Sequence, residues 1–277
     1  MHLPDIWHQF DSIVTSPDEE IDLVRTALLI AATEYPELNV ERELYRIGLL
    51  ADGIAHRIYD DPSPLYHLNT LSEYLFDELG FRGNYENYYD PRNSFLNDVI
   101  ERRLGIPITL SMLYIEIGSQ LGVPLKGVGM PGHFLVKHAE IDDLFVDPFQ
   151  NGILLTVAEC EAKFMQATHG HMPWDMRYLS PISSREFVAR MLRNLKAIYL
   201  QRGEYQRVLS TIDRLLSIQP EASDELRDRG VVNYRLGNHE EALRDLKTYV
   251  TNTARPADAG TVHRLIDQIE CILDENI

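Results

Sequence analysis

The chain has 277 residues, of which 44% are hydrophobic, and its formal net charge is −17 at pH 7. Such a chain can bury one large core or two ordinary ones, which excludes extensive disorder. The charge is unevenly distributed along the chain. Residues 183–277 hold 14 of the 26 basic and 15 of the 43 acidic side chains, which leaves 12 basic and 28 acidic side chains for residues 1–182. A front part this acidic repels phosphate backbones and anionic lipid, so we predict no nucleic-acid and no membrane partner.

No segment of the sequence predicts export or membrane insertion. No apolar run approaches the roughly eighteen residues of a spanning helix, and residues 1–14 lack a basic flank followed by an apolar stretch. The two cysteines, Cys160 and Cys271, are too few and too far apart for a disulfide framework or a zinc site. We therefore expect a cytoplasmic protein with free thiols and no cofactor.

Residues 1–82 follow a helical pattern. The segment Ser16-Pro17-Asp18-Glu19 supplies an N-cap, a proline at the first helical position and acidic residues in the first turn. We predict a helix from this segment to about Ala31, and two further helices over residues 40–59 and 64–79.

The middle of the chain changes from helical to strand periodicity. A turn-rich connection over residues 84–94 and a short helix over 95–103 precede residues 108–122, which are apolar on nearly every side. That pattern is typical of a helix buried at the centre of a domain. Short segments rich in Val, Leu and Phe follow and predict antiparallel strands over residues 125–128, 133–138 and 144–147. The front of the chain is thus predicted to be α+β, helix-rich with a small antiparallel sheet.

The rear of the chain repeats itself. Ser183 begins a capped long helix, and the segment 203–209 recurs as 237–243, an offset of 34 residues with Gly at the inner turn. Thirty-four residues per helix–turn–helix is the tetratricopeptide (TPR) period. Pro220 and Pro256 end the two units, and a last helix is predicted over residues 257–274. We expect two domains, residues 1–182 and an all-α TPR-like module over residues 183–277.

His133 and Asp147 are the candidate catalytic pair. If the strands over 133–138 and 142–147 pair around a turn near Glu140, facing positions sum to 280 and His133 faces Asp147. Directly opposed Cβ atoms lie about 4.5–5.5 Å apart, near enough for a carboxylate–imidazole hydrogen bond. Such a pair can orient a general base, or it can be no more than a satisfied buried polar contact.

Histidines elsewhere do not favour a metal site. His138 lies five residues from His133 on the same strand and therefore projects to the opposite face of the sheet. His169 and His171 have no third ligand at helical spacing. We therefore predict that the chain binds no metal.

Several segments together resemble a known family. A core helix followed by strands that carry His and Asp-Pro is similar to the transglutaminase-like branch of the papain-type fold, in which Cys, His and Asp follow in that order. More specifically, the chain resembles the bacterial SirB-type family, in which such a domain precedes TPR-like helices. The resemblance is carried by Asn93-Ser94-Phe95-Leu96, by residues 102–111 (RRLGIPITLS), by Pro131-Gly132-His133-Phe134-Leu135-Val136 and by Asp147-Pro148-Phe149.

The chain departs from the enzymes of this fold at the nucleophile. In them the cysteine begins the core helix about fifteen residues before its closing Leu-Gly, where the helix dipole favours a thiolate. Here that count leads back to Pro107, and neither it nor its neighbours is cysteine. Cys160 and Cys271 are predicted to be packing residues. The nearest hydroxyls, Thr109 and Ser111, are the remaining nucleophile candidates.

The first helix of the rear module carries a cluster of cations. These side chains suit the clamping of an acidic peptide terminus or a phosphate, and they suit equally the docking of the module on the acidic front domain. The cluster consists of Arg185, Arg190, Arg193 and Lys196.

Three functions remain open from the sequence. The leading one is a non-catalytic or regulatory protein in which a transglutaminase-like scaffold carries a TPR module that binds a protein or peptide. The second is an amidohydrolase or acyltransferase that uses His133 and Asp147 with Ser111, Thr109 or a water molecule. In the third, the repeats alone matter and the front domain is a stable platform.

Overall fold

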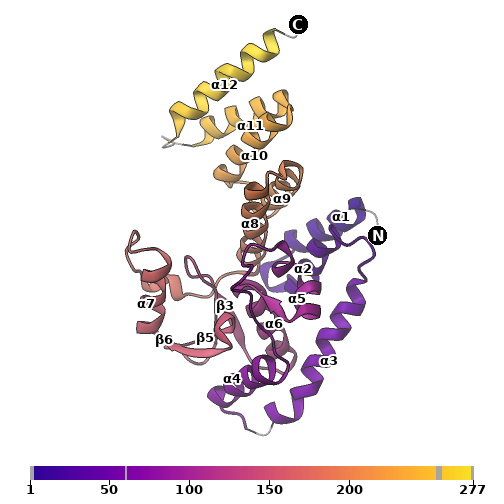
Figure 1. Ribbon diagram of the computed structural model, residues 1–277, viewed down its shortest axis with the longest axis vertical. Helices are drawn as coiled ribbons and strands as arrows, with labels where there is room; N and C mark the ends of the chain where they lie inside the picture. Colours follow the sequence, from indigo (N-terminus) through magenta and orange to yellow (C-terminus); the bar gives the residue numbers. More distant parts are fainter. Residues whose placement is uncertain (1–2, 60, 254–257, 276–277) are drawn as a thin grey trace. The chain divides into compact units, whose positions relative to one another are not determined.

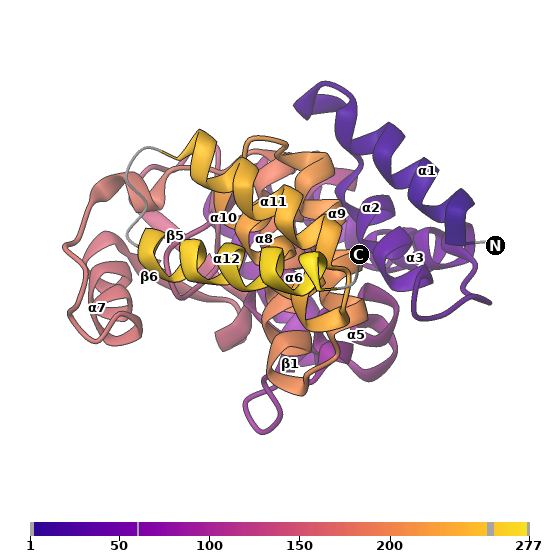
Figure 2. The same ribbon diagram turned by 90° about the horizontal axis from the view of Figure 1, so that it is seen from above.

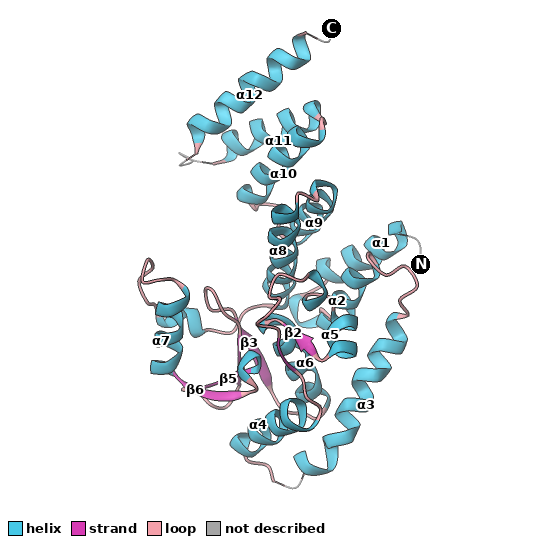
Figure 3. Cartoon of the chain, in the orientation of Figure 1, coloured by secondary structure: helices cyan, strands magenta, loops and turns pink. Residues whose placement is uncertain are grey.

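Helices predominate in the computed structural model, which describes residues 3–59, 61–253 and 258–275 (Figures 1 and 3). The chain divides into two compact units, Met1–Met191 and Leu192–Ile277. The division falls inside helix α8 (Ser184–Arg202), whereas the division predicted from the sequence, at 182/183, lies just before that helix. Among the described residues, no helix combines the length and the apolar character that a bilayer crossing requires.

The front unit confirms the predicted α+β class. Its helices before the sheet are α1 (Leu3–Thr15), α2 (Leu23–Ala32), α3 (Val40–Ile58), α4 (Pro64–Ser72), α5 (Leu96–Arg102) and α6 (Pro107–Gln120). Helix α4 continues as a π-helical segment over Glu73–Glu78, and α7 (Val157–Ala167) follows the sheet. Two short strands missing from the prediction, β1 (Arg82–Gly83) and β2 (Leu104–Gly105), pair in parallel before α6.

Helix α6 is the centre of the front unit, as its apolar sequence predicts. It contacts α2, α3 and α5 as well as strands β3 and β4, and Figure 1 shows it between these helices and the sheet. Ten of its fourteen residues are buried. Burial on nearly every side explains why this segment has almost no polar face.

The four-stranded sheet is antiparallel with the order β3-β4-β5-β6. Its strands are β3 (Leu125–Val128), β4 (Leu135–His138), β5 (Leu144–Asp147) and β6 (Ile153–Thr156), the last of which the sequence reading missed. Strand β4 begins two residues later than predicted. The register was also wrong, since Val136 pairs with Val146 and Lys137 with Phe145, so that facing positions sum to 282 instead of 280.

The predicted cap at Ser16 was wrong. Residues Asp18–Glu20 form one 3-10 turn, and α2 begins only at Leu23, with the Asp22 carboxylate accepting the Arg25 backbone N–H at 2.9 Å. The Asp18 carboxylate instead accepts the backbone N–H groups of Ser184 and Arg185, each at 2.9 Å. Asp18, expected in the first turn of a helix beginning at Ser16, therefore caps α8, 166 residues further along the chain.

The rear unit consists of the second half of α8 and four more helices. These are α9 (Tyr205–Ile218), α10 (Ser223–Leu236), α11 (His239–Asn252) and α12 (Ala259–Asp274). Helix α10 packs on α9 and α11, and α11 packs on α12, as Figures 1 and 2 both show. Gly237 ends α10 with φ of 83°, which favours glycine at this inner turn. Pro256 and the predicted start of the last helix at Ala257 lie outside the described residues.

Candidate functional site

His133 occupies a tight turn just before β4. Gly132 has φ of 76°, and the His133 backbone N–H donates to the Met130 carbonyl at 3.1 Å. The guanidinium of Arg190, on α8, donates to the carbonyls of Gly129, Met130 and His133, the last two at 3.0 and 3.3 Å. Hydrogen bonds to its backbone groups thus hold the turn that carries His133 in place.

Asp147 ends β5 and is completely buried. Its Oδ2 atom lies 2.9 Å from His133 Nε2, and its Oδ1 atom accepts the backbone N–H groups of Phe149 and Gln150 at 3.1 and 3.3 Å. The predicted His133–Asp147 contact is therefore present, although the register from which it was predicted is not. His133 is two residues beyond the position opposite Asp147, and diagonal neighbours on one face of a sheet are still within reach.

Lys163 is a third member of this site, and sequence reasoning missed it. Its Nζ atom lies 2.9 Å from Asp147 Oδ2, the same oxygen that faces His133. Helix α7 carries Lys163 between Cys160 and Phe164, both fully buried in the core beneath the sheet. The available signal was a lysine beside the buried face of α7, the helix that follows β6.

The electrostatics of the site keep Asp147 ionised. Burial alone would raise the pKa of Asp147, but the hydrogen bonds and charges of His133 and Lys163 outweigh burial and hold that pKa below its ordinary value. Cys160 is affected in the opposite way. Its burial and the nearby Asp147 charge raise the pKa of its thiol to about 12, so that the sulfur is protonated at neutral pH.

The two cysteines differ in their surroundings. Cys160 is a packing residue, as predicted, and lies in the apolar core shared by the sheet and α7. Cys271 is exposed on α12, so the packing prediction was wrong for it. Ile269 lies on the face of α12 that joins the core of α11 and α12. Cys271 comes two residues later, and a step of two residues turns a side chain to roughly the opposite side of a helix.

The candidate hydroxyls are not joined to His133. Pro107 occupies the first position of α6, where the fold would place a cysteine. Thr109 Oγ1 accepts the Ile106 backbone N–H at 3.1 Å and donates to the Asn93 carbonyl at 2.8 Å. Ser111 is fully buried, and its hydroxyl has no hydrogen-bond partner among the described residues. In the described part of the chain, the His133 ring hydrogen-bonds only Asp147.

An aromatic surface borders the dyad. The Phe149 ring lies 6.2 Å from the His133 ring, and the rings of Tyr85 and Tyr88 lie 4.4 and 5.9 Å from Phe149. Tyr85 is 62% exposed, and its hydroxyl donates to the Phe149 carbonyl at 3.0 Å. The turn-rich connection expected over residues 84–94 therefore packs on Phe149, whose ring is the neighbour of His133.

Buried amides fix this connection. Asn84 Nδ2 donates to Asn93 Oδ1 at 2.9 Å, and Asn93 Nδ2 donates to the Asn87 carbonyl at 2.7 Å. Because Thr109 also bonds Asn93, this network ties the tyrosine-bearing loop to the start of α6. Thr109 thus has a structural role.

The four predicted cation-cluster residues all have partners within their own units. Arg185 bonds the Val14 and Ser16 carbonyls near Asp18, and Arg190 bonds the turn of His133. In the rear unit, Arg193 Nε lies 3.1 Å and Lys196 Nζ 2.6 Å from the buried Glu225 carboxylate. The four cations therefore do not converge on one anion site.

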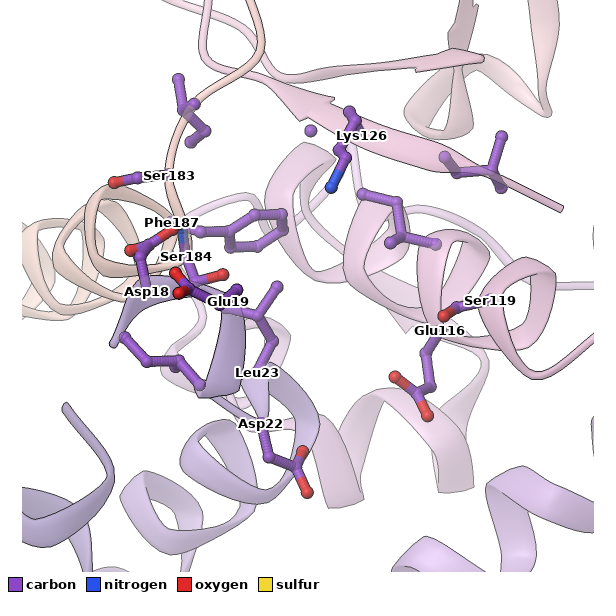
Figure 4. A pocket seen from close by; sticks show the side chains of 15 residues that line it. Asp18, Glu19, Asp22, Leu23, Glu116, Ser119, Lys126, Ser183, Ser184 and Phe187 are labelled. Carbon is purple, nitrogen blue, oxygen red and sulfur yellow. Dashed lines mark hydrogen bonds between the residues drawn. The ribbon is translucent and has the colours of Figure 1, made fainter. Parts of the chain in front are cut away.

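A pocket of about 500 Å³ in the front unit is bordered by carboxylates (Figure 4). Two of them, Asp18 and Asp22, are helix caps. Glu116 is half-buried, and burial together with the Asp22 charge raises its pKa despite a hydrogen bond from Gln120. Neither His133 nor Asp147 lines this pocket, which is therefore distinct from the dyad site.

A second pocket, of about 440 Å³, lies among α9, α10 and α11 in the rear unit. Arg229 in its wall pairs with Asp245 through two hydrogen bonds of 2.7 and 2.8 Å, and Asn238 donates to the buried Asn233 at 3.1 Å. Arg244 and Glu241, also in its lining, are exposed. Side-chain amides and both signs of charge thus line this pocket.

No metal centre emerges from these contacts. Within residues 3–59, 61–253 and 258–275, no three His, Cys, Asp or Glu side chains are arranged to hold an ion. His138 lies buried on β4 and accepts the Glu140 backbone N–H at 3.1 Å through Nδ1.

Both units match known families. Residues 41–193 match the transglutaminase-like superfamily, and residues 195–267 match the tetratricopeptide repeat. A UPF0162 protein from Xylella fastidiosa is 37% identical over 246 residues, which cover 87% of each chain. A UPF0162 protein from Vibrio cholerae is 26% identical over 238 residues, covering 84% of this chain and 88% of that protein. F-box only protein 21 from Pongo abelii is 30% identical over 211 residues, covering 72% of this chain and 33% of that protein.

Proposed function

We propose that this chain, which belongs to a bacterial family that joins a transglutaminase-like domain to TPR repeats, binds a polypeptide through its repeats without covalent chemistry. We further propose that it acts in the cytoplasm, where its free cysteines remain reduced.

The observation that carries this proposal is that, in the part of the chain that the structure describes, no nucleophile bonds the His133–Asp147 dyad. Covalent catalysis needs a thiol or hydroxyl within hydrogen-bond reach of the base. Among the described residues no thiol or hydroxyl bonds the His133 ring, Pro107 begins α6, and the Cys160 thiol is buried and protonated. Within the described residues, the front unit thus has an oriented imidazole with no nucleophile bonded to it.

The repeats supply the binding surface in this proposal. Stacked helix pairs of this kind form extended surfaces for protein partners. The pocket among α9, α10 and α11 offers the exposed side-chain amide of Asn238, with Arg244 and Glu241 exposed beside it. These groups match the alternating donors and acceptors of a peptide backbone.

Turnover measurements test the non-catalytic part. The purified full-length protein is incubated with a panel of peptide amides and esters, in parallel with His133→Ala. We expect neither the wild type nor His133→Ala to convert any of these substrates faster than buffer alone. Hydrolysis or acyl transfer that disappears in His133→Ala would refute the proposal.

Binding measurements test the role of the repeats. A partner captured by the full-length protein is titrated against the wild type, Arg244→Glu and His133→Gln. We expect Arg244→Glu to weaken binding at least tenfold, because a reversed charge beside the pocket opposes the same ligand, and His133→Gln to bind normally. The reverse pattern would place the partner on the front unit.

One observation favours a second function, the hydrolase that activates water. The His133–Asp147 pair is intact at 2.9 Å, and the other ring nitrogen of His133 has no hydrogen-bond partner in the described part of the chain. A water-based mechanism predicts turnover that is lost in His133→Ala and retained in both Ser111→Ala and Thr109→Val. The same assay therefore separates it from a hydroxyl nucleophile.

A further inference from the structure

Five parts of the front unit build the walls of the pocket in Figure 4. They are the turn over Asp18–Glu20, the start of α2, the end of α6, strand β3 and the start of α8. The Ile182 backbone N–H, just before α8, donates to the Gly127 carbonyl of β3 at 2.9 Å. The Asp18 carboxylate accepts the Ser184 backbone N–H, also at 2.9 Å. The protein's own hydrogen bonds thus hold these walls together.

Buried side chains form the apolar part of the walls. Ile21, Leu125 and Phe187 line the pocket, and each of them is buried. Phe187 packs tightly against β3, since a Cβ added to Gly127 would lie 2.9 Å from its Cε2 atom. The volume of about 500 Å³ falls within the range of roughly 300–1,000 Å³ that is typical of small-molecule sites. The pocket therefore has room for a small organic ligand with an apolar segment.

Two side chains of opposite charge line the pocket without pairing. Glu116 comes from α6 and Lys126 from β3, and Figure 4 shows the carboxylate and the ammonium on different sides of the pocket. In the part of the chain that the structure describes, the Lys126 ammonium makes no ion pair or hydrogen bond. The Glu116 carboxylate accepts a hydrogen bond from Gln120 Nε2 at 2.7 Å, and within the same residues no cation pairs with it. Both charges are thus available to a ligand.

The other carboxylates of the pocket differ from Glu116. Asp18 caps α8 and Asp22 caps α2, so the backbone already uses their oxygens. Glu19 is exposed to solvent, whereas Glu116 is half-buried. Burial and the Asp22 charge raise the pKa of Glu116. An ammonium group placed beside this carboxylate would favour its ionised form and would pair with it more strongly than with an exposed group.

We propose that this pocket binds a small zwitterion whose ammonium group pairs with Glu116, whose carboxylate pairs with Lys126, and whose apolar segment packs on Phe187. A ligand with a single charge would pair with only one of the two side chains, whereas a zwitterion pairs with both. Amino acids and their ω-amino relatives belong to this chemical class. The lining residues all belong to the front unit, so the proposal does not depend on peptide binding by the repeats.

Isothermal titration calorimetry of the full-length protein at pH 7 tests the proposal. The probes are the ω-amino acids of four, six and eight carbons, which separate the two charges by different lengths of apolar chain. We expect at least one of them to bind. The alkylamine and the alkanoate of the same length should bind about tenfold more weakly, because each lacks one of the two charge-assisted hydrogen bonds. Failure of all three ω-amino acids to bind would overturn the proposal.

Variants assign the two charges of the ligand. Glu116→Gln should weaken the ω-amino acid about tenfold without weakening the alkanoate, and Lys126→Gln should weaken it about tenfold without weakening the alkylamine. Glu161→Gln and Lys137→Gln remove the same charges at positions outside the pocket lining and should bind every probe as the wild type does. An ω-amino acid that binds equally to the wild type, Glu116→Gln and Lys126→Gln would refute the assigned site.

Discussion

His133 hydrogen-bonds Asp147 at 2.9 Å from a turn outside the strand, although the ladder between β4 and β5 does not pair these two residues. The ladder, continued by one residue, would put Leu135 opposite Asp147. The contact therefore depends on the turn at Gly132, which directs His133 back across the end of β5. Two features position the dyad: the turn at Gly132 and the hydrogen bonds that Arg190 donates to the carbonyls of that turn.

The turn gives the first prediction. Gly132→Ala should destabilise the protein by about 2–4 kcal/mol, because it combines a left-handed backbone with a Cβ that would lie 2.7 Å from the Ala167 Cβ. Gly122→Ala is the control, since Gly122 has a similar φ of 78° but no atom within 4 Å of an added Cβ. It should cost only about 1–2 kcal/mol. Urea unfolding measures both, and equal losses would contradict the proposed close approach of α7.

The buried carboxylate gives the second prediction. Asp147→Asn should lower the free energy of unfolding by about 3 kcal/mol, because it leaves the Lys163 ammonium without a compensating charge. Asp142→Asn serves as the control, since Asp142 pairs with Lys137 but its side chain is 92% exposed. It should change stability by less than about 0.5 kcal/mol. Both values come from urea denaturation at pH 7.

The same carboxylate predicts a pH dependence. The pKa of Asp147 is lower in the folded protein than its ordinary value, so the folded state loses stability when acid protonates this group. The stabilisation is present at neutral pH, declines as pH falls below the ordinary value near 4, and disappears below the folded-state pKa. The stability difference between wild type and Asp147→Asn should shrink over that range. A difference that stays constant from pH 6 to pH 3 would contradict this account.

His138 gives a further prediction: folding stability should also fall on acidification at a higher pH than the range in which Asp147 is protonated. Burial lowers the pKa of His138, with Glu140 opposing and His67 reinforcing the effect. Since the unfolded chain takes up this proton first, stability should fall as pH drops below the ordinary histidine value of about 6.5. His138→Gln should reduce the loss of stability between pH 7.5 and 5.5, whereas replacing the exposed His8 by Gln should not. Thermal unfolding across this pH range measures both.

The cysteines predict a difference in alkylation. Iodoacetamide at pH 8 should modify Cys271, which is exposed, and leave Cys160 intact, because burial and the Asp147 charge raise the pKa of the Cys160 thiol to about 12. Mass spectrometry of the native protein should find one modified cysteine, and the urea-unfolded protein should show two. Rapid native labelling of Cys160 would show that the core beneath the sheet opens.

Local patterns predicted the elements of this chain well. Helix α6 was recognisable because it has almost no polar face. The 34-residue recurrence around Gly203 and Gly237 indicated the helix pairs of the rear unit. Each of these signals depends on residues within one element or one turn, which is why a sequence alone carries them.

The sequence by itself determined the fold class, the face shared by His133 and Asp147, and the absence of a cysteine at Pro107. The face was correct despite the wrong register, because a slip of two residues preserves the alternation of side chains. Only the tertiary structure decided that Lys163 shares the Asp147 oxygen and that Asp18 caps α8. These contacts join elements that are distant in sequence, and their formation depends on how helices pack against a sheet, which no local pattern specifies.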